Sequence, residues 1–119
     1  MPKSKTAALS TCVPKPRLQD RALIDRAVAK DTASLFKLLA NDTRVRLLHA
    51  LAIHKELCVS DLAGQLNMKP QAISNQLQKL AAAKMLASRR EGNSIFYKIV
   101  DPCIPRLLDL GLCLLEEIP

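Results

Sequence analysis

The chain has 119 residues, enough for one domain with a modest core, near the size at which a partner subunit often completes that core. Hydrophobic residues make up 49% of it but aromatic residues only 3%, which favours packed helices over a β-sandwich. The net charge of +7 favours a polyanionic partner, with nucleic acid the first candidate and an anionic membrane surface the second.

Membrane insertion and secretion are not expected. No apolar run approaches the roughly 20 residues of a transmembrane helix. Residues 1–16 lack the continuous apolar core of a secretory signal. We therefore expect a cytoplasmic protein, in which cysteines stay reduced.

The first part of the chain divides into an arm and helices. Residues 1–17 are basic and contain three prolines, which predicts a flexible arm, so that residues 18–119 form the folded domain. Apolar residues then follow a helical period from Asp20 to Leu39, as one kinked helix or as two helices separated by a cap at Asp31-Thr32. Asn41 is expected to end this element and Asp42 to cap a further helix, which runs to about Ile53.

Two short helices around a tight turn are predicted next. Ser60 is the expected N-cap of the first, and residues 67–70 form the turn, with Pro70 at the start of the second. The second helix buries Ile73, Leu77 and Leu80. The exposed polar face of a helix is usually only solvated. The amide, hydroxyl and ammonium groups on the exposed face of this helix, however, also suit base edges and phosphates in a DNA major groove. The candidate DNA contacts on this helix are Lys69, Gln71, Ser74, Asn75, Gln78 and Lys79.

A basic hairpin follows these helices. Residues 85–88 and 94–100 have the composition of short strands, and Gly92-Asn93 suits the turn between them. Arg89, Arg90 and Asn93, together with Lys98, place polar and positive groups where a hairpin would meet backbone phosphate. The combination of helix-turn-helix and basic hairpin is more specific for duplex DNA than either half.

With these elements in place, the chain resembles the ArsR/SmtB family of metal-sensing bacterial repressors. The resemblance rests on residues 39–48 (LANDTRVRLL), 56–63 (ELCVSDLA), 73–77 (ISNQL) and the hairpin from Arg90 to Tyr97. It implies a mainly α fold with a small β-hairpin, a winged helix-turn-helix that dimerises through its terminal helices. It also implies a homodimeric repressor that leaves its double-stranded operator DNA when a metal or metalloid ion binds. One departure is Gln76, where many relatives place a histidine.

Four cysteines bear on which ion is sensed. None forms a C-x-x-C pair, so any metal site must be assembled by the fold or between subunits. Family members with an ELCVCD segment use two thiols there; Cys58 matches the first, but Ser60 stands where the second would be. The resemblance suggests Cys12 on the arm as a partner for Cys58. A cysteine at a helix start is also commonly a small buried hydrophobe.

A second candidate site lies on the last predicted helix, residues 101–117, whose apolar residues surround most of its circumference and predict packing on a second subunit. Zinc-sensing relatives carry Asp-x-His and His-x-x-Glu pairs here; this chain has Asp101 and Cys103 near the start, and Cys113 and Glu117 near the end. Sulfur in place of nitrogen favours Cd²⁺, Hg²⁺, Pb²⁺ or As(III), with Zn²⁺ as a further candidate. Ten residues separate Cys103 from Cys113, about 15 Å along a helix, so one ion would require ligands from two subunits or from another segment.

Two alternatives stay open. A redox- or persulfide-sensing repressor on the same fold would need two cysteines able to bridge. A small cysteine hydrolase would use Cys58 with His54, but no oxyanion loop or orienting group is evident. Both His49 and His54 are expected to be structural.

Overall fold

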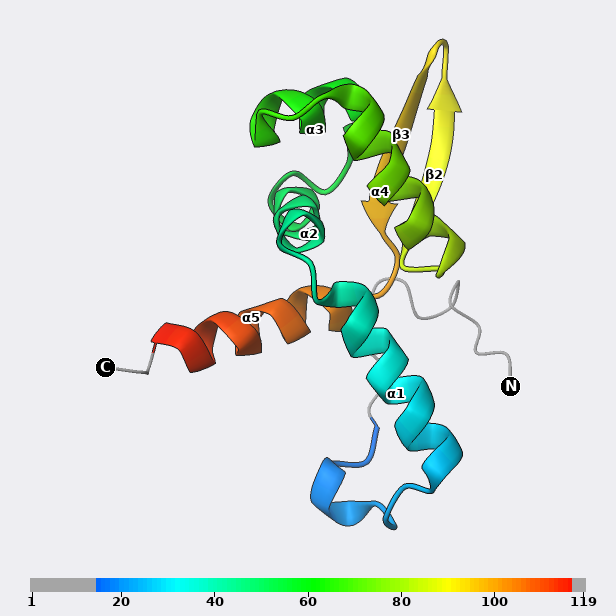
Figure 1. The fold of residues 1–119 in the computed structure, drawn as a ribbon, viewed down its shortest axis with the longest axis vertical. Coiled ribbons are helices and arrows are strands. Elements are labelled where there is room, and N and C mark those ends of the chain that lie inside the picture. Colours follow the sequence, from blue (N-terminus) through cyan, green and yellow to red (C-terminus); the bar gives the residue numbers. More distant parts are fainter. Residues whose placement is uncertain (1–14, 117–119) are drawn as a thin grey trace.

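The computed structural model describes residues 15–116. A 3₁₀ turn, Leu18–Asp20, precedes five helices and three strands. Figure 1 shows α2, α3, α4 and the hairpin of β2 and β3 grouped together, while α1 and α5 project from this group in different directions. In chain order the elements are α1 (Arg26–Leu39), α2 (Asp42–His54), β1 (Leu57–Cys58), α3 (Val59–Leu66), α4 (Pro70–Ala82), β2 (Leu86–Glu91), β3 (Ser94–Ile99) and α5 (Cys103–Glu116).

The core is aliphatic and is built mainly from α2, α3 and α4. Its buried side chains recur at helical spacing on one face of each of these helices, and that face packs against the others. No polar or charged residue among residues 15–116 is buried. The fully buried side chains are Leu47, Leu48, Leu51, Leu62, Ile73, Leu77 and Leu80.

The N-terminal helix is shorter than the apolar pattern predicted, and it is a single unbroken helix. It begins after Asp25, whose carboxylate accepts a hydrogen bond from the N–H of Val28 at 2.9 Å, and it continues through Asp31 without a break. The prediction for the next cap was also wrong in detail. Asn41 is the N-cap of α2 and accepts from the N–H of Arg44 at 3.1 Å, while Asp42 is the first helical residue.

The helix-turn-helix is confirmed, with one correction. Cys58 rather than Ser60 occupies the N-cap position of α3, because the helix starts one residue after strand β1. Asn67 ends α3 in the left-handed region at φ 55°, a conformation that asparagine tolerates well. Pro70 is the first residue of α4, where its missing N–H leaves no acceptor unsatisfied.

The predicted hairpin is part of a three-stranded antiparallel sheet. Strands β2 and β3 pair from Leu86↔Ile99 to Glu91↔Ser94, and Gly92 turns the chain at φ 63°. The sequence did not predict β1, which pairs with β3 through Leu57↔Tyr97 and Cys58↔Phe96. Strand β1 therefore attaches the hairpin to the start of the helix-turn-helix.

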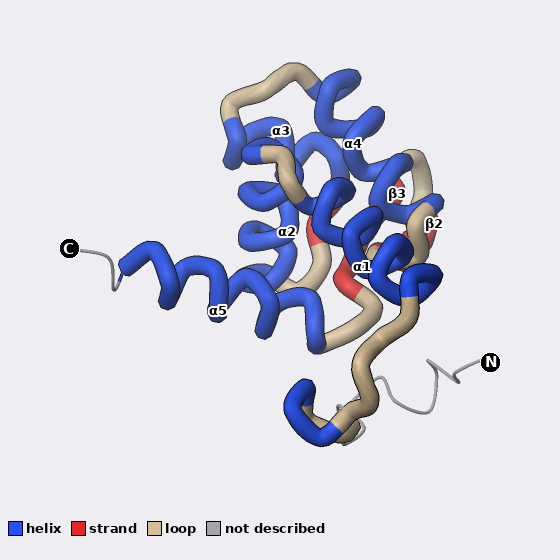
Figure 2. The backbone as a smooth tube through the Cα atoms, turned by 60° about the horizontal axis from the view of Figure 1, so that its bottom comes forward, coloured by secondary structure: helices blue, strands red, loops and turns tan. Residues whose placement is uncertain are grey.

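The terminal helices leave apolar surface uncovered. Figure 2 shows α5 running beside α2 and then beyond it toward the C-terminus. Within residues 15–116, α5 contributes no buried residue and α1 contributes only Leu39. No helix in this range is long and apolar enough to cross a bilayer. The exposed side chains of these two helices include Val28, Leu35, Phe36, Leu110, Leu112, Leu114 and Leu115.

Candidate nucleic-acid interface and thiol sites

Helix α4 presents an ordered polar face opposite its buried one. The Gln71 amide donates to Asn75 Oδ1 at 3.1 Å, and the Gln78 amide donates to Ser74 Oγ at 3.2 Å. Both pairs join residues four apart, which are neighbours on one helix face. These side chains are thus held together on the surface that is predicted to contact bases. All six predicted contacts of this helix are exposed or, for Ser74, half-buried.

The hairpin extends away from the helices, with its tip at Gly92-Asn93 (Figure 1). Arg90, Asn93 and Lys98 are exposed along it. Cations and amides on a projecting hairpin can contact phosphates without reading sequence. Helix α4 and this hairpin therefore present two separate surfaces whose groups suit contact with DNA.

Arg89, predicted as a phosphate contact, has partners within the protein. Its Nε and one terminal nitrogen donate to the two carboxylate oxygens of Glu56, each at 2.9 Å, and its other terminal nitrogen donates to Glu91 Oε1 at 2.6 Å. The guanidinium carbon lies 4.8 Å from the centroid of the Phe96 ring, within cation–π range. Arg89 thus ties β2, across β3, to the residue that precedes β1.

This ion pair shifts the pKa of both the Glu56 carboxyl and the Arg89 guanidinium. The hydrogen bond from Arg89 lowers the pKa of the Glu56 carboxyl below its usual value, and the charges of Arg89 and Lys98 act in the same direction. The carboxylates of Glu56 and Glu91 raise the pKa of the Arg89 guanidinium. Sequence reasoning missed Glu56, because a lone acid before a two-residue strand carries no local signal.

Cys58 lies at the N-cap of α3, beside polar side chains of the first turn of that helix. Only 8% of the residue is exposed, and its Sγ is 3.2 Å both from Ser60 Oγ and from Asp61 Oδ2. The thiol can donate its proton to the Asp61 carboxylate. Ser60, which replaces the second thiol of a two-cysteine site, is therefore a direct neighbour of Cys58 rather than the helix cap.

The other predicted ligands lie at the two ends of α5 or outside the described residues. Cys103 starts the helix and is half-buried; its backbone N–H donates to Asp101 Oδ1 at 2.9 Å, so the Asp101 carboxylate satisfies one N–H of the first turn. Cys113 is exposed near the other end. Cys12 and Glu117 lie outside residues 15–116 and their predicted roles stay predictions.

One subunit does not assemble a metal site from its described residues. Among residues 15–116, no three His, Cys, Asp or Glu side chains come close enough to hold one ion. Thiolate-binding ions commonly take three or more protein ligands when tightly held.

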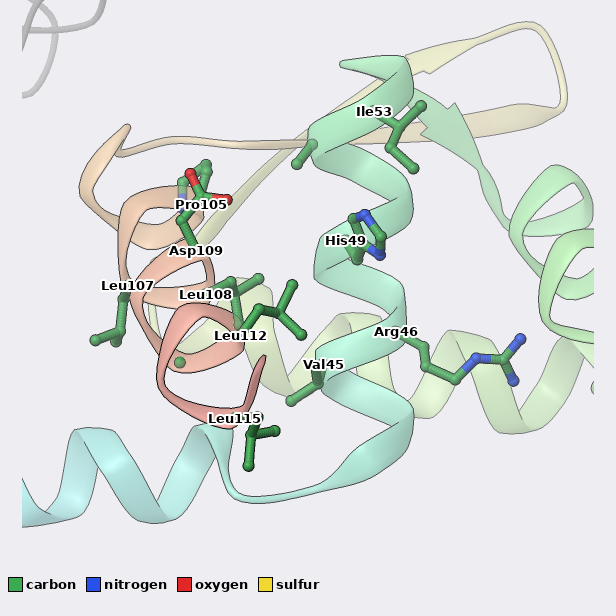
Figure 3. Close-up of a pocket in the computed structure, with 12 residues that line it drawn as sticks. Val45, Arg46, His49, Ile53, Pro105, Leu107, Leu108, Asp109, Leu112 and Leu115 are labelled. Atoms are coloured by element: carbon green, nitrogen blue, oxygen red, sulfur yellow. The ribbon is translucent and has the colours of Figure 1, made fainter. Parts of the chain in front are cut away.

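A groove of about 520 Å³ separates α5 from α2. Figure 3 shows Leu108 and Leu112 of α5 facing Val45 of α2 across it, with the His49 ring on the α2 side. The groove is mainly apolar and is continuous with the exposed leucines of α5. Exposed apolar surface of this kind is typical of protein–protein interfaces.

Comparison with known proteins bears on these surfaces. The model of the family described as "Bacterial regulatory protein, arsR family" matches residues 41–87. The cadmium resistance transcriptional regulatory protein CadC of Listeria innocua is 31% identical over 102 residues, which cover 80% of this chain and 86% of that protein. The transcriptional repressor SmtB homolog of Synechocystis is 38% identical over 73 residues, 61% of this chain and 54% of that protein.

Two solved structures extend the likeness to the fold. The crystal structure of the AntR antimony-specific transcriptional repressor is 61% identical, with a TM-score of 0.77 over 90% of this chain and 96% of that one. A homodimeric winged helix-turn-helix domain from Mycobacterium bovis is 30% identical, with a TM-score of 0.68 over 82% and 92% of the two chains.

The chain belongs to the arsR family of bacterial regulatory proteins. The expected winged helix-turn-helix fold is confirmed, and the chain is a DNA-binding regulator rather than an enzyme. The cysteine hydrolase alternative is therefore wrong.

Proposed function

We propose that the protein is a homodimeric repressor that binds double-stranded operator DNA through α4 and the hairpin, and that leaves the operator when its cysteine thiolates bind a thiophilic ion. The observation that carries the DNA-binding part is the exposed, internally hydrogen-bonded amide face of α4 beside a basic hairpin. Such a face presents donors and acceptors to base edges, while the hairpin cations contact phosphate.

The dimer is proposed to form through α1 and α5. Their exposed apolar side chains would remain in water in a monomer; Phe36 of α1, for example, is 51% exposed and Leu114 of α5 is 67% exposed. Burial of such surface stabilises an interface. A homodimeric relative of the same fold supports this arrangement, and a two-fold dimer would hold the two α4 helices about one DNA turn apart.

The inducing ion is proposed to be a trivalent metalloid, arsenic or antimony, with Cd²⁺, Hg²⁺, Pb²⁺ and Zn²⁺ as competitors. The 61% identity to an antimony-specific repressor favours the metalloid, and the cadmium and arsenic regulators among its relatives favour soft ions generally. Soft ions prefer thiolates, and the cysteines are the soft ligands of this chain.

Cys103 and Cys113 are the proposed primary ligands. They lie at opposite ends of α5, about 15 Å apart along its axis and roughly a quarter turn apart around it. Two α5 helices that pair in opposite directions across a two-fold axis would bring Cys103 of one subunit toward the region of Cys113 of the other. Asp101 and Glu117 are proposed as nearby oxygen ligands, and Cys58 with Cys12 as the competing site.

Fluorescence anisotropy on labelled operator DNA tests the proposal. Antimonite or arsenite is expected to release DNA from the wild-type protein. The Cys103→Ser and Cys113→Ser variants should bind DNA normally but resist release, whereas Cys58→Ser, the matched control, should respond as wild type does. Release that survives Cys103→Ser but fails with Cys58→Ser would place the sensor at the start of α3. DNA affinity that no thiophilic ion changes would refute ion sensing.

A further inference from the structure

We infer that Arg44 is a positioning residue for the recognition helix: it joins α4, through Gln76, to the C-terminal end of α1. The inference rests on the proposed role of α4 in operator binding and adds a residue that does not itself contact DNA. It also gives Gln76 a role different from that of the other amides of α4.

Three hydrogen bonds fix Arg44. Its backbone N–H donates to the Asn41 side chain at the start of α2. Its Nε donates to Gln76 Oε1 at 2.7 Å, and one terminal nitrogen donates to the backbone carbonyl oxygen of Leu38 at 2.8 Å. The two side-chain bonds are partly buried, so water competes for them less than it does at the surface.

The Leu38 carbonyl is one of the last four of α1, which have no partner within their own helix. A cation at a helix C-terminus also interacts favourably with the helix dipole. Arg44 therefore stabilises the end of α1 while its other donor holds a side chain of α4. No other hydrogen bond described between side chains of residues 15–116 spans from α2 to α4.

The planar guanidinium is suited to this task. Its donors point in fixed directions, so that Nε and a terminal nitrogen reach two acceptors on different helices at once. A lysine ammonium is a compact charge on a flexible stem and would not hold both acceptors in this geometry. Arg44 thus fixes the angle of α4 as well as its distance from α1.

The same bond removes Gln76 from base recognition. A glutamine that recognises adenine uses its carbonyl oxygen and its amide nitrogen together. In Gln76 that oxygen accepts from Arg44, and the residue is half-buried rather than exposed like Gln71 and Asn75. Gln76 should therefore affect how α4 is oriented and leave the preferred base sequence unchanged.

Orientation of α4 matters for base contacts more than for phosphate contacts. Base-edge hydrogen bonds require precise alignment of side chains in the groove, whereas nonspecific binding depends on counterion release by cations. Loss of the Arg44–Gln76 bond should therefore weaken binding to specific DNA and spare binding to unrelated DNA.

The test uses the full chain and two 30-base-pair duplexes: one enriched from a random pool by the wild-type protein, and one of the same composition with scrambled sequence. Arg44→Lys keeps the positive charge but removes the planar guanidinium with its two donors, and Gln76→Asn shortens the side chain that carries the acceptor oxygen. Gln78→Asn is the matched control, because Gln78 is exposed and bonds only within α4. Thermal melts of each variant establish that it is folded at the assay temperature.

Each of Arg44→Lys and Gln76→Asn is expected to weaken specific binding about tenfold, the loss of one charge-assisted hydrogen bond. Gln76→Asn should cost nothing further in the Arg44→Lys background, whereas Gln78→Asn should cost the same in both backgrounds. Affinity for the scrambled duplex and the salt slope should not change. A pool selected by the Gln76→Asn protein should yield the wild-type sequence.

Two results would overturn the inference. The first is an equal loss of affinity for the specific duplex from Gln76→Asn in the wild-type and Arg44→Lys backgrounds, which would show that the two residues act independently. The second is a changed base preference in the pool selected by the Gln76→Asn protein. This second result does not depend on whether the Arg44→Lys variant folds. A wild-type protein that enriches no sequence would overturn the proposed function, and the inference with it.

Discussion

Truncation of Leu114 should weaken the proposed dimer by a measurable amount. Leu114 is 67% exposed on α5, so two thirds of its side chain is available for burial by a partner. Replacement by alanine removes about three carbons, each worth about 0.8 kcal/mol when fully buried. Two thirds of that is about 1.6 kcal/mol per chain, or about 3 kcal/mol per dimer because a two-fold interface contains the side chain twice. The dissociation constant should rise roughly a hundredfold.

Sedimentation velocity over a range of protein concentrations measures this change. Leu114→Met is the matched control: it keeps the apolar volume, so its dissociation constant should stay close to that of wild type. Far-UV circular dichroism should be the same for both variants, because Leu114 is not part of the monomer core. A Leu114→Ala protein that dimerises as tightly as wild type would show that the two-fold interface lies elsewhere.

Three further predictions concern the core, the DNA contacts and the hairpin. Leu77→Ala empties a fully buried site on α4 and should lower the free energy of unfolding by about 2–5 kcal/mol in urea titrations; a loss below about 1 kcal/mol would contradict the packing described. Lys69→Ala should reduce the slope of log affinity against log salt by about 1, whereas Asn75→Ala should leave the slope unchanged and cost about 1–3 kcal/mol on specific DNA; the reverse pattern would exchange their roles. Because Arg89 lowers the folded-state pKa of Glu56, their interaction contributes stability that is fully present above the ordinary glutamate pKa of about 4.3 and is lost as pH falls through the lower folded value. Hydrogen exchange of hairpin amides, corrected for the intrinsic rate, should accelerate in that acid range for wild type but show no such step for Glu56→Gln; identical profiles would mean that the pair does not hold the hairpin.

Local patterns predicted the recognition unit well. The spacing of Ile73, Leu77 and Leu80 defined the buried side of α4 because helical periodicity is a property of neighbouring residues, and the structure buries all three. Pro70 and the Gly92-Asn93 turn were predicted for the same reason, since backbone preference acts over one or two residues. The caps of α2 and α3 were each misplaced, because several adjacent polar residues can serve as caps and tertiary contacts choose among them.

The sequence by itself determined the class of this protein: a small, basic, aliphatic chain with a helix-turn-helix, a basic hairpin and cysteines available to soft ions. Only the tertiary structure decided which polar groups meet. Arg44 and Gln76 are 32 residues apart, and Arg89 and Glu56 are 33 apart; no local pattern links such positions, because their contact depends on how α2 packs on α4 and how β1 adds to the hairpin. The same packing places Cys58 at the N-cap of α3 and leaves Cys103 and Cys113 at opposite ends of α5, so that within residues 15–116 of one chain these thiols stay apart.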